Sequence, residues 1–221
     1  FANLIFKGVG RHPKTGKKKG GIKVHTNIHA NEFVPSDIKF TSAATNDSFM
    51  LMPANYNDGD IIAMDRAYID YARFEELTNR GVTYVTKMKK NLVYDTLSDT
   101  MYMLPCGLME CRVQVVEFRK HIKGGENIKH KARIVTYVDP AKKKAKVISL
   151  LTNDMTMEVE DIIDIYRQRW EIELLFKQLK QNFPLKYFYG ESANAIKIQI
   201  WVTLIANLLW SFSGLASMVR I

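Results

Sequence analysis

Cysteine is scarce in this sequence, and Cys106 and Cys111 are the only two among 221 residues. Their spacing matches neither a CxxC pair nor the ligand pattern of a zinc site, which excludes a disulfide-rich scaffold and a cysteine-based zinc centre. The amino-terminal segment also lacks the pattern of a secretory signal peptide. Two reduced thiols in a cytoplasmic protein are the simplest interpretation, so we expect a cytoplasmic location.

Acidic residues are also in short supply. The chain has 23 Asp and Glu against 32 Lys and Arg, a net charge of +9, and no acid occurs between Phe1 and Lys23. An excess of positive charge attracts polyanions, so nucleic acid and an anionic membrane surface are candidate partners. A basic protein without a polyanionic partner explains the charge about as well, and the composition alone does not separate these alternatives.

Only one apolar run, 197–218, approaches the length of a membrane span. It contains Gln199 and Asn207, and it follows an amphipathic helical pattern. These features favour a buried core helix and no membrane partner. We expect the three tryptophans of the chain to pack in the core as well. They are Trp170, Trp201 and Trp210.

Strands and helices alternate in the first part of the chain. Residues 21–30 alternate in polarity and predict a strand, and 34–43 predict a second strand after a turn. A short apolar strand, Ile61 to Met64, ends at Asp65, and a helix and another strand follow it. This order indicates an α/β sheet.

From residue 91 to residue 150 the pattern changes to short strands joined by turns, which indicates an inserted β-rich subdomain. A helix is then expected from about Met157 to Asn182, ended by Pro184. We therefore divide the chain into a first core part, a β-rich insertion and a second core part that carries this helix. The three ranges are 1–90, 91–150 and 151–221.

The insertion contains a basic hairpin tip. His121 and His130 lie there among lysines and an arginine. Solvated charge is the default interpretation of these residues, and contact with nucleic acid is the functional hypothesis.

The expected helix carries a polar stripe within "YRQRWEIELLFKQLK" (166–180). At about 100° per residue, its five members fall on one narrow face of the helix. Charged pairs spaced by four residues also support exposed helices, so a merely solvated face remains open. The five residues of the stripe are Tyr166, Arg169, Glu173, Lys177 and Lys180.

Asp65 is the second candidate for chemistry. It directly follows a short buried strand, and ligands of α/β sheets collect at the carboxyl ends of strands. The alternative is a turn or N-cap aspartate that introduces the next helix. Together, Asp65 and Glu173 would offer hard oxygen ligands to Mg²⁺, with the cations of the stripe positioning phosphates. Two such ions promote attack on a phosphodiester and stabilise its leaving oxygen.

At these residues the sequence resembles a known family. "DRAY" (65–68) and the Y-x2-R-x3-E-x6-K spacing of Tyr166, Arg169, Glu173 and Lys180 resemble the signature of bacterial insertion-sequence transposases of the DDE type. The segments 17–26, 150–153 and 169–181 are also similar, in the same order, so that the resemblance spans almost the whole chain. It implies an RNase H-like mixed sheet flanked by helices, with a β-rich insertion before the glutamate helix.

The resemblance also implies an activity. Asp65 would be the second metal-binding aspartate and Glu173 the third acid, holding two Mg²⁺ or Mn²⁺ ions. Tyr166, Arg169 and Lys180 would contact the DNA backbone, and Lys177 is added to them on helix geometry only. The expected function is cut-and-paste transposition by hydrolysis and transesterification of DNA phosphodiesters. The partners would be double-stranded inverted-repeat ends and target DNA, bound by a homodimer in the bacterial nucleoid.

The amino terminus departs from the family pattern. Such enzymes carry a first aspartate upstream of the segment 17–26, where this chain has no acid. We therefore expect that aspartate to precede Phe1, and we expect this piece alone to be defective in strand cleavage. Two alternatives are a non-catalytic DNA-binding remnant and an RNase H-like nuclease unrelated to transposition.

Overall fold

The computed structural model describes residues 7–11, 18–30, 34–103, 110–121, 127–139, 146–183, 185, 187–190 and 192–218. The chain divides into two units, Asn46–Arg169 on the one hand and Phe1–Thr45 with Trp170–Ile221 on the other. Each unit buries a hydrophobic core of its own.

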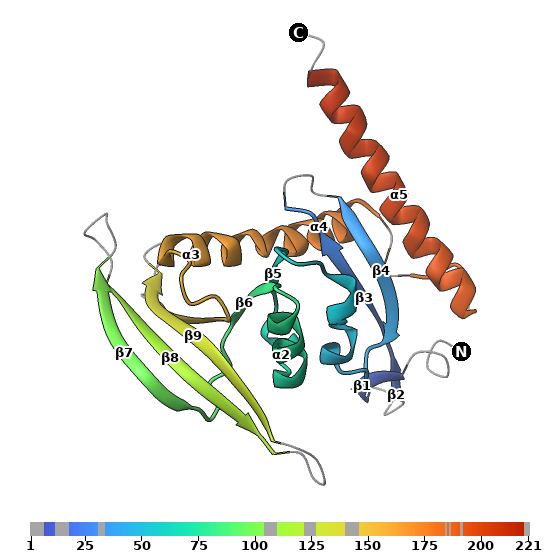
Figure 1. The fold of residues 1–221 in the computed structure, drawn as a ribbon. Coiled ribbons are helices and arrows are strands. Elements are labelled where there is room, and N and C mark those ends of the chain that lie inside the picture. Colours follow the sequence, from blue (N-terminus) through green and yellow to red (C-terminus); the bar gives the residue numbers. More distant parts are fainter. Residues whose placement is uncertain are drawn as a thin grey trace. The chain divides into compact units, whose positions relative to one another are not determined.

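Six strands form the sheet of unit Asn46–Arg169, in the order β5-β6-β10-β9-β8-β7. Figure 1 shows β7, β8 and β9 as long neighbouring strands of this sheet. Strands β5 and β6 are parallel, and the other neighbours are antiparallel. The strands from the predicted insertion therefore continue the sheet of β5 and β6, whereas the division into core and insertion stays a prediction. The strands are β5 (Ile61–Met64), β6 (Thr83–Lys87), β7 (Asp95–Met103), β8 (Glu110–Lys120), β9 (Ile128–Asp139) and β10 (Lys146–Thr152).

Helices α2 (Tyr71–Asn79) and α3 (Val159–Gln168) cover opposite faces of this sheet. Tyr84 belongs to the core cluster that α2 joins, and its neighbour Val85 belongs to the cluster that α3 joins. Because side chains alternate along a strand, consecutive residues of β6 serve different faces. The observed mixed sheet with flanking helices confirms the predicted fold class, an RNase H-like α/β fold.

Local signals mark both ends of helix α2. Oδ1 of Asp70 accepts hydrogen bonds from the backbone N–H groups of Ala72 and Arg73, which caps the first turn. After the helix, Gly81 has a φ of +72°, a left-handed conformation that favours glycine. Two short 3-10 turns precede β5, at Asp47–Met50 (η1) and Pro53–Asn55 (η2).

Asn153 ends the family-like segment 150–153 and ties three elements together. Its Nδ2 donates to the carbonyl of Val82 at 2.8 Å and to Oγ1 of Thr78 at 2.9 Å. Its Oδ1 accepts the backbone N–H of Tyr84 at 2.9 Å. This residue therefore holds the end of β10 against α2 and the start of β6.

His130 is buried, so the prediction of solvated charge is wrong for this residue. Its Nδ1 lies 2.8 Å from Oε2 of Glu75, and its Nε2 lies 2.7 Å from the hydroxyl of Tyr84. Because a carboxylate only accepts, Nδ1 carries the proton and Nε2 accepts from Tyr84. On β9, His130 alternates with exposed Lys129 and Lys131 and so points to the core. His121 is exposed, as predicted.

The stability of this unit should fall in mildly acidic solution. Burial lowers the pKa of His130, and the hydrogen bond and charge of Glu75 offset this only in part. Below the ordinary histidine pKa of 6.5, the unfolded chain takes up a proton that the folded chain still refuses. We expect the melting temperature to drop between about pH 7.5 and about pH 5.5, and to drop less in His130→Gln. An equal decrease of the melting temperature in the wild-type protein and in His130→Gln would show that His130 is not the group responsible.

The other unit is built on two strand pairs and two helices. Strands β3 and β4 lie where the sequence predicts two strands, and they pair antiparallel from Ile22↔Ser42 to Ile28↔Pro35. His25 is packed there, with Nε2 2.8 Å from Oγ1 of Thr41. The elements are β1 (Lys7–Arg11), β2 (Lys18–Gly20), β3 (Ile22–Ile28), β4 (Pro35–Ser42), α4 (Trp170–Asn182) and α5 (Ala193–Met218).

The predicted single helix from Met157 to Asn182 is two helices, α3 and α4, separated at Arg169. Arg169 keeps helical dihedrals, with φ −51° and ψ −25°, but its N–H bonds to the carbonyl of Arg167. The ladder of bonds to the fourth preceding residue is therefore interrupted. No proline or glycine marks this position, so the polar pattern does not reveal the break. The boundary between the two units falls at the same place.

Helix α5 buries one stripe. Ile196, Ile200 and Leu204, spaced by four residues, join a core cluster with side chains of β3 and β4. The window Ala193–Trp210 is long and apolar enough to cross a membrane by length and composition, and 28% of it is buried. The predicted core helix is therefore correct for this stripe, whereas other apolar side chains of α5 are exposed.

The tryptophans do not pack in the core as predicted. The exposed fractions are 55% for Trp170, 41% for Trp201 and 73% for Trp210. Trp201 has an edge contact with Phe40, with ring centroids 5.8 Å apart. On α5, the two tryptophans lie on either side of the buried stripe, and aromatic content alone does not tell such flanks from the stripe.

Candidate active site

Asp65 lies at the carboxyl end of β5, as the sequence predicts, and it is exposed. It is also the N-cap of the 3-10 turn η3 (Arg66–Tyr68), where its Oδ1 accepts the N–H of Ala67 at 2.9 Å. Among the described residues, no hydrogen bond reaches its Oδ2. Asp65 thus lies at the edge of the sheet and caps a turn through Oδ1, while its Oδ2 is available to bind a ligand.

Tyr68 is a neighbour of this acid that the sequence interpretation missed. Burial raises the pKa of Tyr68 to about 12, and the charges of Asp47 and Asp65 add to the shift. Both carboxylates are therefore within electrostatic reach of one phenol. The only sequence signal was the place of Tyr68 inside "DRAY".

Tyr166 and Arg169 lie together at the end of α3. The guanidinium carbon of Arg169 lies 5.3 Å from the centroid of the Tyr166 ring, within the range of a cation–π contact. The ring of Tyr166 also packs against the core cluster on the α3 face of the sheet. The arrangement restrains the arginine side chain before any ligand arrives.

Glu173, Lys177 and Lys180 share one face of α4, because they are spaced by four and three residues. All three are exposed, whereas Leu179 is buried in the core of that unit. The geometry agrees with the polarity predicted for this half of the stripe. One carboxylate is followed by two cations along an exposed surface.

The two predicted acids belong to different units, Asp65 to Asn46–Arg169 and Glu173 to the other. Their meeting in one site therefore stays a prediction. Among the described residues, no group of three histidine, cysteine, aspartate or glutamate side chains is placed to hold a metal ion. The exposed carboxylate of Asp65, with an oxygen outside the cap, nevertheless suits a hard cation such as Mg²⁺.

Comparisons with known proteins identify the family of the chain. Residues 6–209 match the family model described as the transposase DDE domain. A protein of Sinorhizobium fredii named as a transposase is 24% identical over 196 residues, which cover 89% of this chain and 54% of that protein. A Synechocystis protein, named as an insertion-sequence transposase, is 29% identical over 153 residues, covering 69% of this chain and 40% of the relative.

A third relative, from Geobacillus stearothermophilus and also named for an insertion sequence element, is 24% identical over 204 residues. The match covers 87% of this chain and 49% of that protein. The chain thus spans about half the length of the relatives it matches. Because the family model covers nearly the whole chain, from residue 6 to residue 209, the chain belongs to the transposase DDE domain family.

Proposed function

We propose that this chain forms the catalytic core of a transposase that cleaves and joins the phosphodiesters of transposon-end DNA. The observation that carries the proposal is the exposed carboxylate of Asp65 at the carboxyl end of β5, with one oxygen outside the turn cap. Glu173, on the exposed face of α4, would complete the acid pair. The net charge of +9 suits a polyanionic substrate.

Asp65 and Glu173 would hold Mg²⁺ or Mn²⁺, two ions in the intact enzyme. When bound, such ions supply Lewis-acid stabilisation of the charge on the reacting phosphate. Lys177 and Lys180 would bind phosphate oxygens as point charges, and Arg169 would bind them through its planar fork of N–H groups. The ring of Tyr166, stacked near that guanidinium, would orient the fork.

The chemistry would consist of two displacements at phosphorus. In the first, water attacks a phosphodiester at the transposon end, the P–O3′ bond breaks, and the departing oxygen takes a proton to become a 3′ hydroxyl. In the second, that hydroxyl attacks a phosphodiester of the target, forming one P–O bond and releasing another 3′ hydroxyl. A homodimer holding two ends would couple both reactions in space.

Removal of divalent ions should separate binding from chemistry. We expect the complete protein to cleave end-containing duplexes with Mg²⁺ or Mn²⁺, and to lose cleavage but keep DNA binding with EDTA, because phosphate contacts by Lys and Arg need no metal. Gel analysis of cleaved and joined products measures the first effect, and a mobility shift measures the second. Binding without cleavage under any divalent ion would indicate a non-catalytic remnant. Cleavage indifferent to the ends, without joining, would indicate a nuclease.

A further inference from the structure

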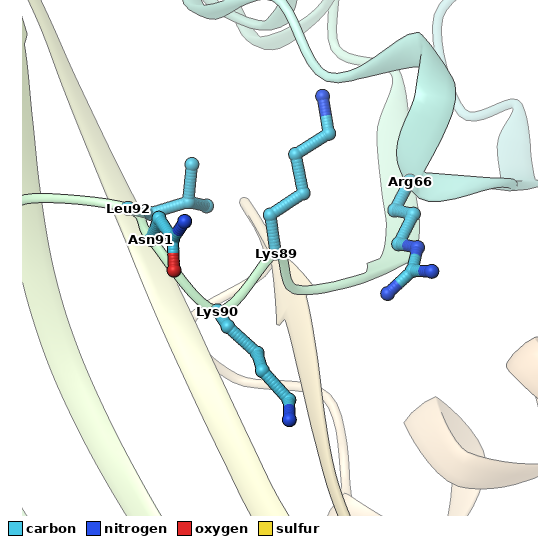
Figure 2. A pocket seen from close by; sticks show the side chains of 5 residues that line it. All are labelled: Arg66, Lys89, Lys90, Asn91 and Leu92. Carbon is cyan, nitrogen blue, oxygen red and sulfur yellow. The ribbon is translucent and has the colours of Figure 1, made fainter.

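Unit Asn46–Arg169 contains a basic cavity of about 390 Å³, and one of the residues that line it, Arg66, directly follows Asp65 in the sequence. Three of its five lining residues carry a positive charge, and none is acidic. Figure 2 shows the side chains of Arg66 and Lys90 running in the same direction and that of Lys89 running in the opposite one. The five residues are Arg66, Lys89, Lys90, Asn91 and Leu92.

The parallel pairing of β5 and β6 explains why residues more than twenty positions apart meet here. The register runs from Ile61↔Thr83 to Met64↔Thr86. The carboxyl ends of both strands therefore lie at one edge of the sheet, and that edge is where ligands of α/β sheets bind. Arg66 follows the first strand and Lys89–Asn91 follow the second.

Both walls of the cavity are anchored on the same hydrophobic core. Behind Arg66, Tyr68 and Ile69 pack against the cluster on the α2 face, and Met88 and Leu92 pack against it on either side of the lysines. The N–H of Met88 also donates to the carbonyl of Ser149 at 2.9 Å, which fixes the chain as it leaves β6. The backbone that carries the cations is thus held before a ligand binds.

The charge of the cavity is not neutralised locally. Elsewhere in this unit, exposed arginines pair with acids, as Arg112 does with Asp99 and Arg119 with Glu117. Within the described part of the chain, no such ion pair involves Arg66, Lys89 or Lys90. Clustered cations in a concave surface focus an electrostatic field that attracts anions.

We propose that this cavity binds a backbone phosphate of the DNA duplex next to the one that Asp65 serves. The choice of DNA as the anion rests on the proposed function, whereas the cavity and its charge do not. Arg66 and Lys90 grip the phosphate from two segments, and the amide of Asn91 offers a further donor. Lys89, which points the other way, extends the contact along the strand.

The test measures how the 221-residue chain binds a random-sequence duplex by fluorescence anisotropy at several salt concentrations. Each of Arg66→Gln and Lys90→Gln should reduce the slope of log K against log salt by about 0.9, because one phosphate contact is lost. Lys90→Arg should restore the slope. Arg80→Gln removes the same charge at the end of α2, near the amino ends of β5 and β6, and should leave the slope unchanged.

Several outcomes would overturn the proposal. If both cavity variants keep the wild-type slope while Lys180→Ala lowers it, the cavity does not bind DNA and the proposed function stands. If Arg80→Gln lowers the slope as much as the cavity variants, general charge explains the effect. If the wild-type chain does not bind duplex DNA, the cavity proposal and the DNA-binding part of the proposed function fail together. Equal melting temperatures of the variants ensure that folding is not the cause.

Discussion

Replacing Glu173 by glutamine in the complete protein should abolish strand cleavage and leave binding to transposon ends intact. Glutamine keeps the length and helix propensity of glutamate, and the side chain is exposed on α4, so folding should not suffer. The substitution removes the negative charge with which this residue would hold a divalent ion. Loss of about 4 kcal/mol of transition-state stabilisation corresponds to about 10³-fold in rate. Single-turnover cleavage of an end-containing duplex measures it.

Lys180→Ala provides the matched control on the same helix face. It should weaken DNA binding and lower the salt slope by about one, as expected for a phosphate contact, yet retain cleavage when DNA is saturating. The two variants therefore separate the effect on cleavage from the effect on DNA binding at positions only seven residues apart on one helix. Cleavage by Glu173→Gln at the wild-type rate would remove this residue from the catalytic acids.

Local patterns predicted the core around Asp65 well. The run Ile61–Met64 is apolar and short, and Asp65, which follows it, was considered as the N-cap of a turn or helix. Each of these patterns involves only a few neighbouring residues, so the structure that it predicts does not depend on distant parts of the chain. The structure has the predicted strand, helix and second strand in this order, as β5, α2 and β6.

Local patterns could not predict which strands pair when they are far apart in the sequence. Strand β10 pairs with β6 through Leu150↔Lys87, more than sixty residues apart, and thereby joins the predicted insertion to the α/β sheet. Periodicity tells which residues of a strand are buried but does not name the neighbouring strand. The basic cavity is hidden from sequence for the same reason, because parallel pairing brings its two walls together.

His130 shows a different limit. Its two-residue alternation with Lys129 and Lys131 was visible in the sequence, yet the surrounding positive charge suggested a solvated tip. The alternation correctly places the His130 side chain in the core. Its burial is tolerated because Tyr84 and Glu75 form hydrogen bonds with both ring nitrogens. The predicted single helix under the polar stripe was wrong for another reason. Its period continues through Arg169, where the helix itself is interrupted.

Asp65→Asn should lose cleavage in the complete protein by about 10³-fold, the equivalent of about 4 kcal/mol, while the protein keeps its melting temperature. Asparagine is as good an N-cap as aspartate, so its carbonyl oxygen still accepts the N–H of Ala67. The asparagine side chain lacks the negative charge of aspartate and its second anionic oxygen.

Asp65→Ala distinguishes the two roles of this residue. Alanine removes the cap as well as the charge, so this variant should lose both cleavage and up to about 1 kcal/mol of stability. If Asp65 served only as a cap, asparagine would preserve cleavage and alanine would impair it in proportion to the lost stability. Parallel measurement of cleavage rates and melting curves for both variants decides between these results. Because both substitutions remove the charge and only alanine removes the cap, a catalytic role requires that Asp65→Asn also loses cleavage.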